Sequence, residues 1–291
     1  MKNNKQILVT GGAGFVGTNL IKLLLKKTSY KIVSIDNYTS GTKLNHIRSS
    51  RVKYIKGNTA NISKFVKNPN KIKTIFHFGE FARIYQSFLK MDQCIESNSI
   101  GTNAIFNFCL KHKVKLVYSA TSASLGNKGN DRNLSPYAFT KAKNLELLEN
   151  LKKWFNFKYE VIYFYNVYGP HQICRGQMST VIGIFEDHYK RKEPLPVVLP
   201  GTQTRRFTHI SDTVEICYLA WKKNLCRHYS IASKKSYSVL EVAKIFKSKI
   251  KFLPRRKGER YASALTKMNL SNKIYKHFGK IELKDYIHNL I

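Results

Sequence analysis

A glycine-rich turn near the N-terminus constrains the fold of this chain more than any other feature. Gly11, Gly14 and Gly17 directly follow an apolar run at 6–9 and open a segment with leucines at helical spacing. Glycine is needed where a backbone turns sharply, approaches a pyrophosphate closely and lets a helix pack on a strand. The helix N-terminus that follows favours phosphate charge. The turn therefore predicts a strand, a phosphate-binding loop and a helix, which together begin a dinucleotide-binding domain.

The residue that ends the next apolar run, Asp36, specifies the dinucleotide. In such domains an acidic residue about 20 positions beyond the glycines accepts hydrogen bonds from the ribose hydroxyls. A carboxylate there would repel a 2′-phosphate, so the sequence predicts NAD and not NADP as the cofactor. The alternative, a glycine turn without a ligand and with Asp36 as a cap, leaves the order of strand, glycines, helix, strand and acid unexplained.

Apolar runs and helical patterns alternate through the first half of the chain. Further strand candidates lie at 72–78, 115–119 and 159–165, and helical patterns at 94–112 and 138–155. This alternation predicts an α/β fold with a doubly wound, Rossmann-type parallel sheet.

The pattern loosens after Gly169-Pro170, and further helical patterns lie at 211–223 and 237–249. We therefore expect residues 1–166 to form the NAD-binding domain, with segments of about 203–232 returning to it. Residues 167–291 would form mainly a smaller C-terminal lobe that binds the substrate.

Composition limits the class of protein. Lys and Arg number 51 against 17 Asp and Glu, a net charge of +34 that attracts nucleic acid, anionic membranes or anionic substrates. The lysines are dispersed along the chain, as on a solvated surface. The five cysteines show no ligand spacing, which predicts reduced thiols and no metal site. No apolar run approaches the roughly 20 residues that span a bilayer. We expect a cytoplasmic protein with neither a membrane segment nor a specific nucleic-acid partner.

A tyrosine and a lysine provide candidate chemistry. Tyr137 and Lys141 follow Ser135-Pro136, a helix-start signal, and lie one turn apart on one helix face. A nearby ammonium lowers the phenol pKa from about 10, so Tyr137 could act as a general base towards a sugar hydroxyl. Alone, such a pair in a lysine-rich chain is more often a solvated helix face. Thr121 strengthens the assignment because it lies beyond the end of a predicted strand, where α/β sheets bind ligands.

Together these residues resemble the extended short-chain dehydrogenase/reductase family, specifically its NAD-dependent nucleotide-sugar epimerases and dehydratases. The resemblance spans almost the full length, at 10–17, 36–37, 76–79, 98–103, 119–126, 163–170, 201–207 and 256–259, besides Tyr137 and Lys141. It implies a cofactor site made by Gly11, Gly14, Phe15, Val16, Gly17, Asp36, Asn37, Asn58, Phe78, Gly79, Tyr137 and Lys141. It implies catalysis by Thr121, Tyr137 and Lys141, and substrate contacts from Thr121, Asn166, Arg205 and Arg256. The two arginines would hold the substrate pyrophosphate.

Several positions depart from the family pattern. Asn58 stands where the family usually has an adenine-contacting Asp, Arg206 replaces an Asp, and Leu125 replaces a Tyr. Glu80 replaces a small residue near the nicotinamide, and Arg83 follows it closely. Either side chain could contact the substrate, and Arg83 is equally consistent with a surface charge.

One further departure separates the reactions of the family. Its dehydratases carry Asp-Glu directly after the catalytic Thr, whereas this chain has Ser122 and Ala123. The resemblance therefore favours an NAD-dependent epimerase of the UDP-glucose 4-epimerase type, which inverts a sugar centre through a transient keto-sugar. The alternatives are heptose 6-epimerisation, 4,6-dehydration or keto-sugar reduction on the same fold. Alternatives of another class are a basic nucleic-acid-binding protein or a catalytically silent subunit.

The resemblance also implies a homodimer, because the family usually pairs through the helices at about 94–112 and 137–155. Leu145, Leu148 and Leu151 fit such a helix bundle, but they fit core packing equally. The base and the sugar of the substrate are not specified by the sequence.

Overall fold

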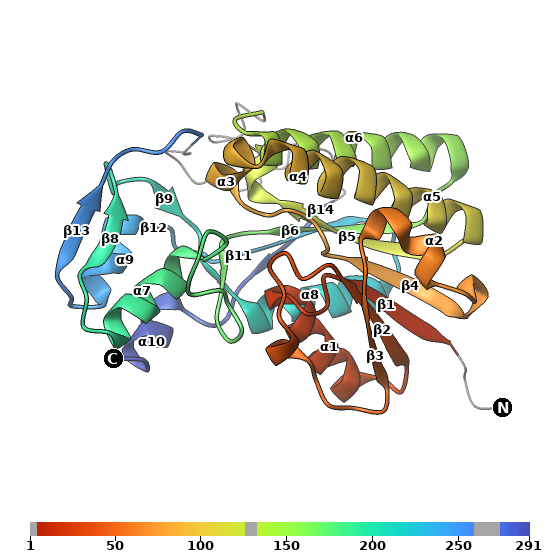
Figure 1. Ribbon diagram of the computed structural model, residues 1–291, viewed down its shortest axis with the longest axis horizontal. Helices are drawn as coiled ribbons and strands as arrows, with labels where there is room; N and C mark the ends of the chain where they lie inside the picture. The colour runs from red at the N-terminus through yellow and green to blue at the C-terminus, as the bar shows by residue number, and fades with distance from the viewer. Residues whose placement is uncertain (1–4, 126–132, 259–273) are drawn as a thin grey trace.

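Eight parallel strands form the central sheet of the computed structural model, which describes residues 5–125, 133–258 and 274–291 (Figure 1). Their order is β14-β11-β6-β5-β4-β1-β2-β3, and every neighbouring pair is parallel. The strands are β1 (Gln6–Thr10), β2 (Lys31–Asp36), β3 (Val52–Lys56), β4 (Ile72–His77), β5 (Lys115–Thr121), β6 (Tyr159–Phe164), β11 (His228–Ala232) and β14 (Ile274–Phe278). The doubly wound sheet that the alternation of apolar runs and helical patterns predicts is confirmed.

Helices cover both faces of this sheet (Figure 1). On one face lie α1 (Phe15–Lys27) and α8 (Ile210–Lys223), and on the other lie α2 (Ile62–Phe65), α5 (Thr102–His112) and α6 (Pro136–Phe155). Successive strand residues point to opposite faces, so Ile7 and Val9 join the core under α1 while Leu8 joins the core under α5. Burial on both faces explains the continuous apolar runs of these strands.

The leucines of α6 belong to the core. Leu148 and Leu151 are buried, and Leu145 packs against the same cluster. The apolar side chains that α6 does expose are Phe139, Trp154 and Phe155. The homodimer stays a prediction, and these leucines do not support it.

The C-terminal lobe, whose elements lie at the left of Figure 1, has its own small core. Its elements are β8 (Leu195–Val198), β13 (Ile250–Leu253), α7 (Val181–Lys190), α9 (Val239–Ile245) and α10 (Leu283–His288). Two short pairs complete it, β7 (Val167–Tyr168) with β10 (Thr208–His209) and β9 (Thr204–Arg205) with β12 (Tyr237–Ser238). Strands β11 and β14 leave this part of the chain and pair in the main sheet. No helix in the described ranges has the length and apolar character needed to cross a bilayer.

The single helix expected over 237–249 is wrong. The first two residues form β12, and Ser238 caps α9 by accepting a hydrogen bond from the Glu241 backbone N–H at 3.0 Å. The helix ends at Ile245, and Lys247 adopts a left-handed φ of 53°. The chain then turns into β13, which pairs with β8 in parallel and so does not extend the helix.

Candidate active site

A cavity of about 420 Å³ lies at the carboxyl ends of β1, β2, β4 and β5. Open α/β sheets bind their ligands at this edge. Every residue predicted to bind the cofactor lines the cavity: Gly11, Gly14, Phe15, Val16, Gly17, Asp36, Asn37, Asn58, Phe78, Gly79, Tyr137 and Lys141. Residues separated by more than a hundred positions are therefore brought into one site.

The glycine turn has no room for side chains. Gly11 has a φ of 68°, and a Cβ there would lie 2.9 Å from the backbone nitrogen of Gly79. A Cβ on Gly17 would lie 2.2 Å from the Gly11 carbonyl oxygen, so the close packing of α1 on the turn requires glycine. Gly14 caps α1 without a side chain, which leaves the helix N-terminus open to a pyrophosphate.

Asp36 fastens the end of β2 to this turn. Its carboxylate accepts hydrogen bonds from the backbone N–H of Ala13 at 3.0 Å and of Tyr38 at 2.8 Å. Burial raises the pKa of Asp36, and these hydrogen bonds oppose the rise. Two carboxylate oxygens offer about four acceptor sites, so capacity remains for ribose hydroxyls. The backbone cradle and this carboxylate fit NAD.

Removal of this carboxylate tests the cofactor preference. We expect Asp36→Ala to weaken NAD binding by about tenfold or more, since hydrogen bonds to a charged group contribute about 1.5–3 kcal/mol. Binding of NADP should fall less, because the repulsion of its 2′-phosphate also disappears. Calorimetric titration with both dinucleotides measures this. Asp187→Ala on α7, a carboxylate paired with Arg175 and Arg191, is the control. An unchanged NAD affinity in Asp36→Ala would contradict the assignment.

Tyr137 and Lys141 lie on the first turns of α6. Ser135 caps the helix by accepting from the Ala138 N–H at 3.1 Å, and Pro136 occupies the first helical position, as the sequence predicts. Both side chains are buried and line the cavity. The Tyr137 backbone N–H donates to Ser87 Oγ of α3 (Ile84–Leu89) at 3.3 Å, which ties the start of α6 to α3.

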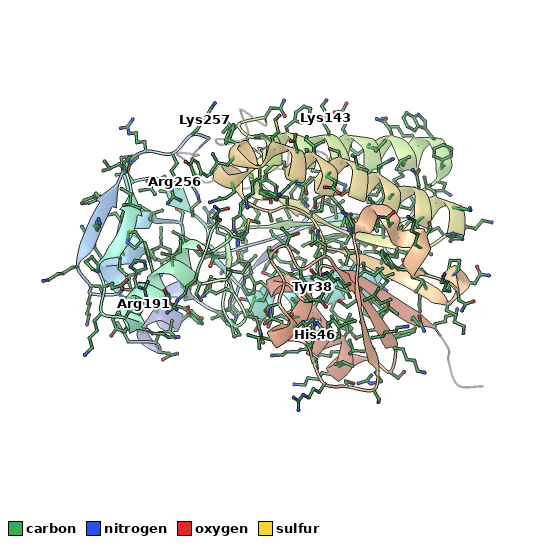
Figure 2. The ribbon with its side chains drawn as sticks, in the orientation of Figure 1. Tyr38, His46, Lys143, Arg191, Arg256 and Lys257 are labelled. Atoms are coloured by element: carbon green, nitrogen blue, oxygen red, sulfur yellow. The ribbon has the colours of Figure 1, made fainter. Side chains whose placement is uncertain are left out.

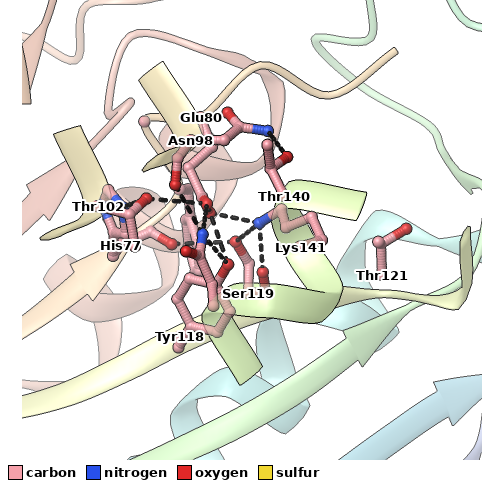
Figure 3. Close-up of polar contacts among 12 residues, drawn as sticks. His77, Glu80, Asn98, Thr102, Tyr118, Ser119, Thr121, Thr140 and Lys141 are labelled. Atoms are coloured by element: carbon pink, nitrogen blue, oxygen red, sulfur yellow. Dashed lines mark hydrogen bonds and ion pairs between the residues drawn. The ribbon is translucent and has the colours of Figure 1, made fainter. Parts of the chain in front are cut away.

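Lys141 is held in an ion pair with Glu80 (Figure 3). The two side chains are only 4% and 2% exposed. The Lys141 ammonium also donates to the Ser119 carbonyl at 2.5 Å and lies 4.7 Å from the centre of the Tyr118 ring. Burial lowers the pKa of Lys141, and the Glu80 charge opposes that change. The predicted catalytic lysine therefore has a buried anionic partner.

Hydroxyl and amide groups complete the environment of Glu80. Its Oε1 accepts from Thr102 Oγ1 and Tyr118 OH, both at 3.0 Å, and from Asn144 Nδ2 at 3.4 Å. Thr102 lies in the motif at 98–103 that the family resemblance includes, whereas the sequence does not mark Tyr118 and Asn144 as site residues. They lie on β5 and α6, and no local pattern marks them.

His77 extends this network as a neutral ring. Its nitrogens lie 2.7 Å from Thr10 Oγ1 and 3.0 Å from Thr102 Oγ1. Because Thr102 donates its proton to Glu80, it must accept from His77 Nε2, which assigns the proton to that nitrogen. Burial lowers the pKa of His77 to about 4, in agreement with a neutral imidazole.

The loop that carries Glu80 is clamped by Asn98. Its amide accepts from the Phe81 N–H at 2.6 Å and donates to the Phe81 carbonyl at 3.0 Å. Asn98 lies in a π-helical turn, Glu96–Gly101, between α4 (Met91–Ile95) and α5. Such turns are rare inside helices and frequent at functional sites. The continuous helix expected over 94–112 is therefore interrupted beside the cavity.

Arg83 is a residue of the cavity lining and not a surface charge. Its Nε donates to the Met178 carbonyl at 2.9 Å, and Nη1 donates to the Ala82 carbonyl at 2.7 Å. Met178 packs against the cluster that contains Tyr137. Glu80 and Arg83 thus both belong to the cavity, and the alternative left open for Arg83 is resolved.

The predicted substrate residues do not line the described cavity. Thr121 is buried at the end of β5, and its Oγ1 accepts from the Ala123 N–H at 3.1 Å, which leaves its own proton to donate. Asn166 has a φ of 35° and donates to the Arg206 carbonyl at 3.2 Å. Arg205 is buried in β9, whereas Arg256 is exposed.

Arg256 nevertheless approaches the loop and helix that carry Arg83. Its guanidinium lies 5.4 Å from the centre of the Tyr85 ring on α3, and Lys257 lies over Phe88 of the same helix. Figure 2 shows Arg256 and Lys257 where the C-terminal lobe meets α3. The structure thus brings the segment of Arg256 to the rim of the domain that holds the cavity.

A larger cavity of about 850 Å³ lies at the opposite edge of the sheet. Its lining includes Lys27 and Lys222, which lie in the last turns of α1 and α8. Lysine at these positions offsets the negative end of a helix, so the lining has a structural explanation. None of the predicted site residues lies there. Among the described residues, no group of His, Cys, Asp and Glu is placed to hold a metal.

Known proteins resemble this chain in sequence and fold. The model of the NAD dependent epimerase/dehydratase family matches residues 7–232. ADP-L-glycero-D-manno-heptose-6-epimerase of Brachyspira hyodysenteriae is 29% identical over 83% of this chain and 80% of its own length. A putative UDP-glucose 4-epimerase of Methanocaldococcus jannaschii is 27% identical, over 84% and 83%. The crystal structure of Thermotoga maritima UDP-glucose 4-epimerase with UDP-glucose superposes with a TM-score of 0.83, at 22% identity, over 97% and 96% of the chains.

Proposed function

Since the chain belongs to the NAD dependent epimerase/dehydratase family, we propose that it is an epimerase of a nucleotide sugar, of the UDP-hexose 4-epimerase type. The observation that carries this proposal is the placement of Tyr137 and Lys141 in the cavity that also holds the glycine turn and Asp36. A binding module without chemistry has no need for a tyrosine and a lysine at this point.

The chain's own residues have distinct roles in the proposed reaction. Tyr137 removes a proton from a ring hydroxyl, and the hydroxyl of Thr121 donates a hydrogen bond to that oxygen. The glycine turn and Asp36 would hold NAD, which would supply reversible hydride transfer at the sugar carbon. Arg205 and Arg256 hold the substrate pyrophosphate while the sugar ring rotates in the site. The binding energy of the pyrophosphate thus keeps the substrate bound in both orientations of the sugar.

The charges of the cavity support epimerisation over dehydration. The residues after Thr121 are Ser122 and Ala123, both buried and without a carboxylate. Three acids among the described residues line the cavity: Asp36 accepts from two backbone N–H groups, Glu80 is paired with Lys141, and Glu96 accepts from Asn58 Nδ2 at 2.9 Å. An elimination needs an acid at the sugar ring, and neither position after Thr121 supplies one.

A second candidate on the same fold is heptose 6-epimerisation, which the Brachyspira hyodysenteriae relative favours. Both reactions leave NAD unchanged overall, so absorbance alone does not separate them. Reductase chemistry would consume a reduced cofactor. The dispersed lysines give no support for specific nucleic-acid binding, and we propose a cytoplasmic enzyme that acts on a nucleotide sugar as a homodimer.

Product analysis separates these reactions. The holoenzyme is incubated with UDP-glucose, UDP-galactose and an ADP-heptose, and proton NMR reads which stereocentre changes. We expect interconversion at the sugar 4-position with no net change in NADH absorbance. Inversion at the heptose 6-position, loss of water or stoichiometric NADH turnover would each replace the proposal by the corresponding alternative.

A further inference from the structure

Two charged residues near Tyr137 and Lys141 have no role in the proposed reaction. Glu80 and Arg83 both lie on the segment between β4 and α3, and both line the cavity with Tyr137 and Lys141. Figure 3 shows Glu80 directed at the Lys141 ammonium, within a network that leaves the neighbouring Thr121 apart. Both charges therefore lie in the cavity that Tyr137 lines.

The first consequence concerns Lys141. Its ammonium is bonded to the Glu80 carboxylate and to the Ser119 carbonyl, and the pair is almost completely buried. In an environment of low dielectric constant, a carboxylate in direct contact with an ammonium offsets most of the field of that ammonium. Lys141 therefore has less positive field to offer the Tyr137 phenolate than an unpaired lysine would have.

The second consequence concerns Arg83. In the part of the chain that the structure describes, its guanidinium donates to the carbonyl oxygens of Ala82 and Met178 and forms no ion pair with a carboxylate. Among the described residues, no carboxylate therefore offsets its charge. Arginine stays protonated in proteins, so this charge is permanent. Arg83 bonds to the Met178 carbonyl, and Met178 packs against the cluster that contains Tyr137, so Arg83 and Tyr137 are joined through Met178 and line the same cavity. Burial lowers the pKa of Arg83, and a charge on Tyr137 opposes that change.

We propose that Arg83 is a positioning residue that supplies the positive charge which holds Tyr137 as a phenolate, because Glu80 takes up the charge of Lys141. The role of that phenolate as the base rests on the proposed function. In this arrangement Lys141 keeps its place as a hydrogen-bond donor in the cofactor cavity, while its net charge is neutralised. Arg83 replaces it as the cation that no carboxylate of the described residues neutralises.

The other titratable groups around this cluster hold one charge state near neutral pH. The groups that face it are His77 of β4, Cys94 of α4 and Tyr118 of β5. Burial lowers the pKa of His77 to about 4 and raises that of Cys94 to about 11. Burial also raises the pKa of Tyr118. Between these limits, the ionisation of Tyr137 depends on Glu80, Arg83 and Lys141.

The experiment measures the ionisation of Tyr137 without substrate. The phenolate absorbance of the full chain is followed against pH, and the same titration of a Tyr137→Phe background is subtracted. We expect Arg83→Met to raise the Tyr137 midpoint by about 1–3 pH units, the range for an opposite charge within a few ångströms. Glu80→Gln should lower it, because the field of Lys141 is then released, and Arg83→Lys should keep it near the parent value.

Matched controls remove the same charges elsewhere. Lys143→Met and Glu146→Gln break an exposed pair on α6, next to Lys141 in sequence, and should leave the midpoint unchanged. An unchanged midpoint in Arg83→Met, or a rise in Glu80→Gln, would overturn the proposal. If Glu80→Gln fails to fold, the raised midpoint expected for Arg83→Met and the unchanged midpoint expected for Arg83→Lys still decide the question.

The same titration separates this inference from the proposed function. Midpoints that shift as expected in a chain that epimerises no nucleotide sugar would refute the proposed function and leave the Arg83 assignment standing. Unchanged midpoints in an active epimerase would refute the Arg83 assignment alone. In an active enzyme, the acid limb of the kcat profile should move in the same direction as the midpoint.

Discussion

Tyr137→Phe should lower the turnover of nucleotide sugar by at least about 100-fold, the loss typical of removing a general base. The phenyl ring fills the same buried position among Phe81, Ala123 and Ala138, so the fold and the cavity should be retained. Only the proton acceptor is lost. Initial rates of product formation measured by NMR, with NAD affinity measured on the same preparation, provide the test.

Two further observations make this result specific. The affinity for NAD should stay within about twofold of the parent, because Asp36 and the glycine turn are untouched and a tenfold change corresponds to about 1.4 kcal/mol. Tyr30→Phe, which removes a hydroxyl bonded to Lys73 at the opposite edge of the sheet, should turn over normally. Near-normal turnover in Tyr137→Phe would refute its role as the base.

The parts of the fold that the sequence predicted are those with short-range causes. The strand, turn and helix around Gly11, Gly14 and Gly17 depend on local backbone requirements, and the buried parallel strands are continuous apolar runs. The start of α6 follows from Ser135 and Pro136. Each of these signals lies within a few residues of the element that it specifies.

The elements that the sequence did not predict depend on distant partners. Strand β14 forms because it pairs with β11, where Ile274 lies opposite His228, 46 positions earlier in the chain. Strand β13 forms because it pairs with β8. The pattern at 237–249 has helical periodicity throughout, yet pairing of its first residues with β9 and a left-handed turn at Lys247 shorten the helix. Tertiary pairing overrides local periodicity here.

The candidate site shows the same division. The residues expected to bind the cofactor belong mostly to compact motifs, and all of them line one cavity. The role of Glu80 was not predicted, because its partners come from three other elements: Thr102 from α5, Tyr118 from β5, and Asn144 and Lys141 from α6. The sequence shows only that Glu80 departs from a family pattern. Only the folded structure shows that the Glu80 carboxylate pairs with the Lys141 ammonium.

Glu80→Ala should lower the free energy of unfolding by about 3–5 kcal/mol, the cost of removing one partner of a buried ion pair. Without Glu80, the buried Lys141 ammonium retains the Ser119 carbonyl, and the hydroxyls of Thr102 and Tyr118 lose their acceptor. Denaturant unfolding of the apo chain, followed by circular dichroism, measures the loss. Glu146→Ala, which breaks the exposed pair with Lys143, should unfold within error of the parent.

A double variant tests the physical cause. Lys141→Met alone leaves Glu80 without its cation, so it should also destabilise the chain strongly. Glu80→Ala combined with Lys141→Met removes both charges, and the double loss should be clearly smaller than the sum of the two single losses. Residues in direct contact show such coupling, by about 0.5–3 kcal/mol. Additive losses would mean that the two charges do not stabilise each other. The low exposure of both side chains would then reflect packing of their hydrocarbon parts, and Lys141 would have its full charge to offer Tyr137.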